Sequence, residues 1–87
     1  MKIKGEFVLS EIGGEVIAVS IANEKGDFDG MINLTETGAF LWRLLEKDVT
    51  EDLLVKELLT NYNVDEQTAK LDVKEFINKL KEKDLLI

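Results

Sequence analysis

The 87-residue chain contains no histidine, no cysteine and no proline. Without histidine and cysteine, it lacks the commonest general base, the strongest nucleophile and the usual ligands of transition metals. Disulfide bonds are also excluded, so packing alone must hold this small fold together. Asp27 and Asp29 belong to a segment that lacks the loop length and the distal glutamate of a calcium-binding hand. We therefore predict a binding domain that is not an enzyme and that uses neither a metal nor a cofactor.

Long hydrophobic runs are absent as well. Runs such as residues 16–19 and 53–55 are far shorter than the roughly 20 residues that a bilayer-spanning helix needs. The N-terminus begins with basic residues, but neither the apolar stretch nor the cleavage site of a secretory signal follows. We expect a cytoplasmic protein without a membrane partner.

Positive charge is scarce, since 11 lysines and arginines stand against 18 aspartates and glutamates. The resulting net charge of −7 repels polyanions and leaves little counterion release to drive their binding. Nucleic acid is therefore not an expected partner. Hydrophobic residues make up 45% of the chain, which is enough for one globular domain over residues 1–87.

The first third of the chain has the alternating pattern of β-strands. Phe7 and Leu9 fall on one face of a first strand. In a second run, alternation divides the side chains between two opposite faces. One face carries Ile17, Val19 and Ile21, and the other carries Val16, Ala18 and Ser20. Gly13 and Gly14 lie between the two runs, and because both tolerate positive φ, they predict a tight hairpin.

A third short strand is expected at about residues 28–33, after a charged loop at residues 23–27. Alternation places Ile32 with Leu34 on one of its faces and Met31 with Asp29 on the other. The three strands would form an antiparallel meander. Its third strand is then a possible free edge.

Three amphipathic helices should follow, each with a start signal. Asn33 is the expected cap of the first helix, with Glu36 completing a capping box. Thr50 is expected to cap the second helix, and Asp65 to begin the third, which should end near Lys83. Their apolar stripes consist of Phe40, Leu41, Leu44 and Leu45, then Leu54, Leu58, Leu59 and Tyr62, and finally Ala69, Val73, Phe76, Ile77 and Leu80. The predicted fold class is α+β, with three helices packed against a three-stranded sheet.

Several segments carry a family resemblance. They are residues 30–42 (GMINLTETGAFLW), 50–53 (TEDL) and 62–65 (YNVD), and then Asp72-Val73 with Phe76, Leu80 and Leu85-Leu86. In this order and spacing, from about Gly5 to Leu86, the chain resembles the PqqD-like family of RiPP recognition elements. The resemblance implies a winged-helix-like domain that binds the leader segment of a ribosomally synthesised precursor peptide and presents it to a separate modifying enzyme.

The resemblance also implies a place for the peptide, as a strand added to the third strand in the cleft against the third helix. The expected free edge agrees, because its unpaired backbone groups can accept a further strand. The predicted peptide-binding residues are Phe28, Asp29, Gly30, Met31, Ile32 and Asn33 around the third strand, and Asp72, Val73, Phe76 and Lys79 on the third helix. Core packing is the simpler interpretation of Val73 and Phe76, and Asp72 could instead be a surface carboxylate paired with a lysine. Trp42 is expected to seal the helix packing.

Two alternative functions stay open. The helical order is compatible with a DNA-binding winged helix, although six acidic residues outnumber five lysines along and around the third helix. A general protein-interaction domain is the other alternative. The sequence is compatible with a monomer or a weak homodimer.

Overall fold

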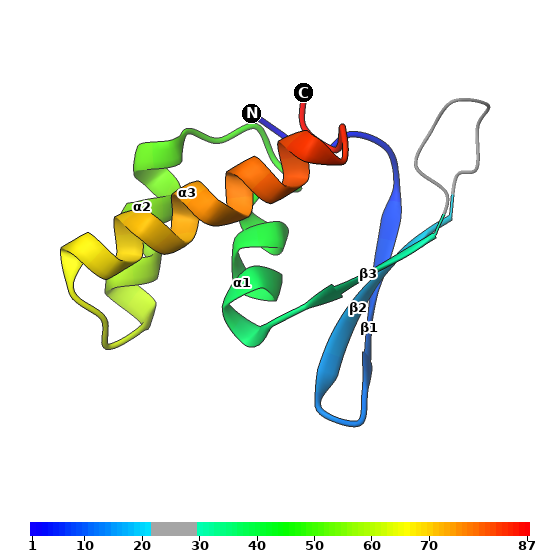
Figure 1. Ribbon diagram of the computed structural model, residues 1–87, viewed down its shortest axis with the longest axis horizontal. Coiled ribbons are helices and arrows are strands. Elements are labelled where there is room, and N and C mark those ends of the chain that lie inside the picture. The colour runs from blue at the N-terminus through cyan, green and yellow to red at the C-terminus, as the bar shows by residue number, and fades with distance from the viewer. Residues whose placement is uncertain (22–29) are drawn as a thin grey trace.

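The computed structural model describes residues 1–21 and 30–87. The elements are, in chain order, β1 (Phe7–Ile12), β2 (Glu15–Ser20), β3 (Met31–Leu34), α1 (Glu36–Leu44), α2 (Glu51–Asn61) and α3 (Glu66–Glu82). The strands form one antiparallel sheet in the order β1-β2-β3. Figure 1 shows the three helices gathered beside the sheet, with β3 leading directly into α1 and the β1–β2 turn pointing away from the helices. The predicted α+β, winged-helix-like arrangement of three strands followed by three helices is confirmed.

The β1–β2 turn is the hairpin that the two glycines predict. Gly13 and Gly14 have φ values of 59° and 84°, and Ile12 faces Glu15 across the turn. Two consecutive residues with positive φ match a two-residue turn whose twist suits the flanking strands. Any side chain at either position would strain this turn.

The junction between β3 and α1 differs from the prediction. The third strand ends at Leu34 and still contains Asn33, which pairs with Ile17 of β2 and therefore does not cap α1. The cap is Thr35, whose extended backbone lets its hydroxyl oxygen accept the Gly38 N–H at 3.0 Å. The start of the predicted third strand, at Phe28 and Asp29, lies outside the described residues, as does the predicted loop at 23–27.

The other two helix starts agree with the sequence. The Thr50 hydroxyl accepts the Leu53 N–H at 3.1 Å, and the Asp65 carboxylate accepts the Thr68 N–H at 2.7 Å. Lys83 caps the end of α3. Among the described residues, none of the helices combines the length and the apolar character that crossing a bilayer requires.

The core lies between the sheet and the helices. The strands contribute Val16 and Ala18 on β2 and Ile32 and Leu34 on β3 to this core. The buried helical residues are Gly38, Ala39, Leu41 and Trp42 on α1, Leu54 and Leu58 on α2, and Ala69, Val73, Phe76, Ile77 and Leu80 on α3. Trp42 is 1% exposed and meets the Phe7 ring edge to face at 5.2 Å between centroids, which confirms its predicted packing role.

The two ends of the chain pair with each other, a feature that the sequence pattern did not predict. Ile3 bridges Leu86 in antiparallel fashion, and the Lys4 N–H donates to the Leu85 carbonyl at 2.7 Å. The Ile3 N–H also donates to the Leu45 carbonyl at 2.8 Å. Figure 1 shows the two termini close together above the helices. This pairing fixes the start of β1 relative to the ends of α1 and α3.

Candidate functional site

The outer edge of β3 carries backbone groups that point away from the sheet. The Ser20 N–H donates to the Gly30 carbonyl at 3.2 Å, and Ala18 faces Ile32 two residues further along the ladder. In an antiparallel pair, every second residue turns its N–H and C=O toward the neighbouring strand. The backbone groups of Ile32 are therefore directed to β2, whereas those of Met31 and Asn33 are directed outward. β3 has β2 as its single neighbour among the described strands, so these outward groups form an open edge.

The side chains of β3 divide between two environments. Ile32 and Leu34 are 4% and 6% exposed and pack in the core, as the predicted alternation requires. Met31, by contrast, is 67% exposed, and Asn33 is exposed as well. A strand added beside β3 would thus contact the backbone and the side chains of Met31 and Asn33. The buried Ile32 side chain anchors this edge to the core.

A groove of about 530 Å³ begins where β3 ends. One wall is the start of α1 with the residue before it, and the other wall is the middle of α3. The lining residues are Thr35, Thr37, Gly38 and Leu41 on the first wall and Asp72, Glu75, Phe76 and Lys79 on the second. Because Thr35 directly follows β3, the open edge and the groove are continuous along the chain.

Gly38 allows the two walls to approach closely. A methyl group added at Gly38 would lie 3.3 Å from Cε1 of Phe76 and 3.2 Å from the Thr35 hydroxyl oxygen, both tighter than ordinary van der Waals contact. The Phe76 ring therefore rests against the backbone of α1. Phe76 is 9% exposed, so it is mainly a core residue whose edge also forms the floor of the groove.

The rim of the groove carries both signs of charge. Asp72 is half-buried, while Glu75 and Lys79 are exposed. Leu41 and Phe76 contribute the apolar part of the lining. Such a site can take an apolar side chain on its floor while the carboxylates and the ammonium group contact polar or charged groups of the same ligand.

The structure places the predicted site residues in three situations. Gly30, Met31, Ile32 and Asn33 form or precede the open edge, and the α3 residues Asp72, Phe76 and Lys79 line the groove. Val73 is 0% exposed and belongs to the core, so its contribution to a site is through packing. Phe28 and Asp29 lie outside the described residues.

Sequence reasoning missed the α1 wall of the groove, together with Glu75. A signal for Glu75 was present, since it lies three residues after Asp72 and four before Lys79, on the same helical face. Gly38 could also have been noticed, because a glycine early in a helix is unfavourable unless close packing requires it.

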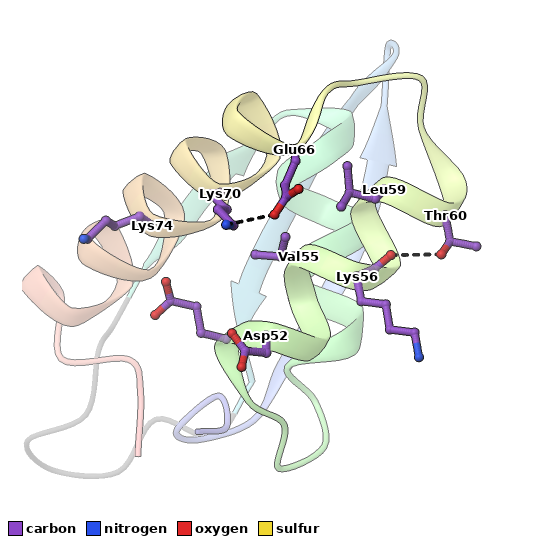
Figure 2. A pocket seen from close by; sticks show the side chains of 9 residues that line it. Asp52, Val55, Lys56, Leu59, Thr60, Glu66, Lys70 and Lys74 are labelled. Atoms are coloured by element: carbon purple, nitrogen blue, oxygen red, sulfur yellow. Dashed lines mark hydrogen bonds and ion pairs between the residues drawn. The ribbon is translucent and has the colours of Figure 1, made fainter.

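A second groove, of about 650 Å³, lies between α2 and α3. Figure 2 shows Val55 and Leu59 of α2 beside Glu66 and Lys70 of α3, with an ion pair of 2.9 Å joining the last two. The Glu66 carboxylate raises the pKa of Lys70, mainly by accepting its hydrogen bond. None of the residues that line this second groove also lines the groove between α1 and α3. This groove is consequently separate from the open edge of β3, and no predicted site residue lines it.

Similar proteins are found among solved structures and family profiles. No curated protein sequence matches the chain. A solved structure described as "TbiB1 in Complex with the TbiA(beta) Leader Peptide" is similar, with 29% sequence identity and a TM-score of 0.74 over 99% of this chain and 94% of that one. The sequence profile of the family described as "Coenzyme PQQ synthesis protein D (PqqD)" matches residues 6–86. Because this match covers nearly the whole chain, the protein belongs to the PqqD family.

Proposed function

We propose that this protein binds the leader segment of a ribosomally synthesised precursor peptide as a fourth strand on β3 and presents it to a separate modifying enzyme. The observation that carries the proposal is the open edge, where the N–H and C=O groups of Met31 and Asn33 point away from the sheet. A polypeptide is the ligand whose own donors and acceptors repeat with the spacing of such an edge.

The continuous groove explains how an added strand could be selected by its side chains. Successive side chains of a strand point to opposite faces. One set would continue the face of Ile32 and Leu34, toward the helices, where the floor formed by Leu41 and Phe76 can take an apolar side chain. The other set would lie beside Met31 and Asn33. Backbone bonds would supply general affinity for a strand, and the groove would supply preference for particular leaders.

The leader peptide itself is supported by the comparisons. The similar solved structure is described as bound to a leader peptide, and its likeness extends over nearly the full length of both chains. The absence of histidine and cysteine from the sequence fits a module that presents its ligand to a separate enzyme, so we propose that this protein is not itself catalytic. Because the proposed ligand is made by the ribosome, we place the encounter in the cytoplasm.

Hydrogen exchange during a titration with candidate leader peptides tests the proposal directly. Binding should slow exchange of the outward-directed Met31 and Asn33 amides, while the Ile32 amide, already directed into the ladder, should change little. A scrambled peptide of the same composition provides the control. If a leader peptide binds but leaves exchange at Met31 and Asn33 unchanged, strand addition at β3 is wrong. Duplex DNA should show no binding at physiological salt, because the net charge is −7.

A further inference from the structure

The side of the sheet that faces away from the helices is unusually apolar. When one face of an antiparallel sheet packs on the core, the other commonly carries polar side chains. Here the register places six large apolar residues on that other side, and we call them the outer face: Val8, Ile12, Ile17, Val19, Ile21 and Met31.

The members of the outer face adjoin across the strands. Val8 pairs with Val19, and Val19 pairs with Met31, so one apolar row crosses the whole sheet. Val8 is 48% exposed and Met31 is 67% exposed, and the outlying Ile12 and Ile21 are 63% and 57% exposed. Single exposed apolar residues are ordinary, but an adjoining set of this kind marks an interaction surface.

The charges beside the outer face are acidic. Glu6 lies next to Ile21, since its carbonyl accepts the Ile21 N–H at 3.2 Å, and Glu15 lies opposite Ile12 at the hairpin. The described strand residues on this side of the sheet include no lysine or arginine. Together with the net charge of −7, this disfavours nucleic acid and anionic lipid surfaces, and it disfavours a second copy of the chain, whose acidic groups would meet these glutamates.

We infer that the outer face is a docking surface for a different protein, whose contact patch is apolar at its centre and basic at its rim. Charge complementarity selects this occupant, because basic side chains can pair with Glu6 and Glu15 while the apolar centre of the partner covers the exposed apolar row. The inference rests on the proposed function only in taking that protein to be the modifying enzyme. A peptide added at the outer edge of β3 would leave the β1 and β2 part of the outer face uncovered.

A synthetic amphipathic helix with lysines flanking its apolar stripe serves as a probe of this chemistry, and the same helix with glutamates in place of the lysines is its counterpart. Fluorescence anisotropy measures the binding of each probe. The double variant Val8→Thr/Ile12→Thr removes apolar surface but keeps β-branched residues, and Glu6→Lys/Glu15→Lys reverses the rim charge. Leu71→Ser is the matched control, because Leu71 is 55% exposed but lies on α3.

The lysine-flanked helix should bind the wild-type protein, and the glutamate-flanked helix should not. Both double variants should lower the affinity about tenfold, whereas Leu71→Ser should leave it unchanged. Equal binding by Val8→Thr/Ile12→Thr and wild type, or no binding of the lysine-flanked helix to the wild type, would overturn the inference. Sedimentation could also overturn the inference. If the wild type is a dimer and Val8→Thr/Ile12→Thr dissociates it, the occupant of the outer face is a second copy of the chain.

Titrating a leader peptide into the same variants separates this inference from the proposed function. None of the substituted residues belongs to the β3 edge or to the α1–α3 groove, so leader affinity should be retained in all of them. A wild-type protein that binds no leader would contradict the proposed function but leave the probe results in force.

Discussion

The two edge strands of the sheet, β1 and β3, differ in what lies beside them. Both turn alternate backbone groups away from β2, at Leu9 and Glu11 on β1 and at Met31 and Asn33 on β3. The edge of β3 continues into the groove of about 530 Å³ between α1 and α3. The hollows near the two ends of β1 are smaller, about 260 Å³ and 370 Å³, and each is lined by two glutamates and one basic residue, with Glu6 in the first and Glu11 in the second.

In the proposed function, an open edge is only half of a peptide site. Any edge strand offers backbone groups to a passing strand, and proteins commonly discourage such pairing with charged residues. The glutamates near β1 fit that role. Beside β3, the groove adds an apolar floor and a charged rim, so a strand that pairs there can be chosen by its side chains.

Proline substitutions along the two edges should produce the largest effects. Ile32→Pro removes an N–H directed to β2 and a side chain that is only 4% exposed, so it should destabilise the fold by at least about 3 kcal/mol. Met31→Pro removes an outward N–H at the first residue of the strand, where proline is tolerated. It should spare the fold and abolish leader binding. Circular dichroism, melting and peptide titration measure these outcomes.

Glu11→Pro is the matched control on the other edge. Its N–H also points outward and its side chain is exposed, so both the fold and leader binding should survive. If a folded Met31→Pro protein binds the leader with unchanged affinity, the two edges do not differ in the proposed way. The groove would then have to act without strand addition.

Truncation of the groove floor should have the next largest effect. Phe76 is 9% exposed, and Phe76→Ala should lower the free energy of unfolding by roughly 3–5 kcal/mol, as for other core aromatic residues. Leader binding would then fall indirectly. Phe76→Leu keeps an apolar side chain and should cost less than about 1.5 kcal/mol, so it reports on the groove in a folded protein. Denaturant unfolding that finds Phe76→Ala as stable as wild type would refute the core role of this ring.

Local features of the fold were easier to predict from the sequence than features that depend on tertiary packing. The Gly13-Gly14 turn and the caps at Thr50 and Asp65 were predictable, because each depends on residues close in the chain. The cap of α1 was misassigned to Asn33, because the local pattern allowed that residue as well as Thr35 to begin a helix. Tertiary pairing decided the matter, since β2 holds Asn33 in the sheet.

The candidate site was predictable to a similar extent. The open edge and the α3 residues Asp72, Phe76 and Lys79 followed from alternation and from the family resemblance. Which amides of β3 point outward depends on its register with β2, and that register is a property of the assembled sheet. The α1 wall around Gly38 required knowledge of how closely α1 and α3 approach. Neither fact is encoded in a local pattern.

A smaller effect is expected from filling the close contact that shapes the groove. Gly38→Ala should leave the stability within about 1 kcal/mol, because the gain in helix propensity offsets the crowding against Phe76. The displaced ring would alter the groove floor, so leader affinity should fall while the outer edge of β3 is unchanged. Leader titration and thermal melting together test the effect of Gly38→Ala. The control variant is Leu71→Ala, because Leu71 is exposed on α3. Wild-type affinity in a folded Gly38→Ala protein would mean that the groove floor does not contact the leader.

The smallest effect concerns the first turn of α3, the helix that gives β3 its groove. The Thr68 N–H donates to the Asp65 carboxylate and lowers the pKa of that group below its ordinary value of 3.8. A lowered pKa in the folded state means that the stabilisation is complete above the unfolded pKa and is lost as the pH falls through the folded pKa. Asp65→Asn keeps a capping oxygen but cannot titrate. Its stability should therefore fall less steeply than that of the wild type over this acidic interval, and urea unfolding across a pH series measures the two slopes. Because the other carboxylates titrate in both proteins, the difference between the slopes isolates Asp65. Parallel slopes would show that the cap does not couple protonation to folding, and that the wall of the groove is held by the core side chains of α3 alone.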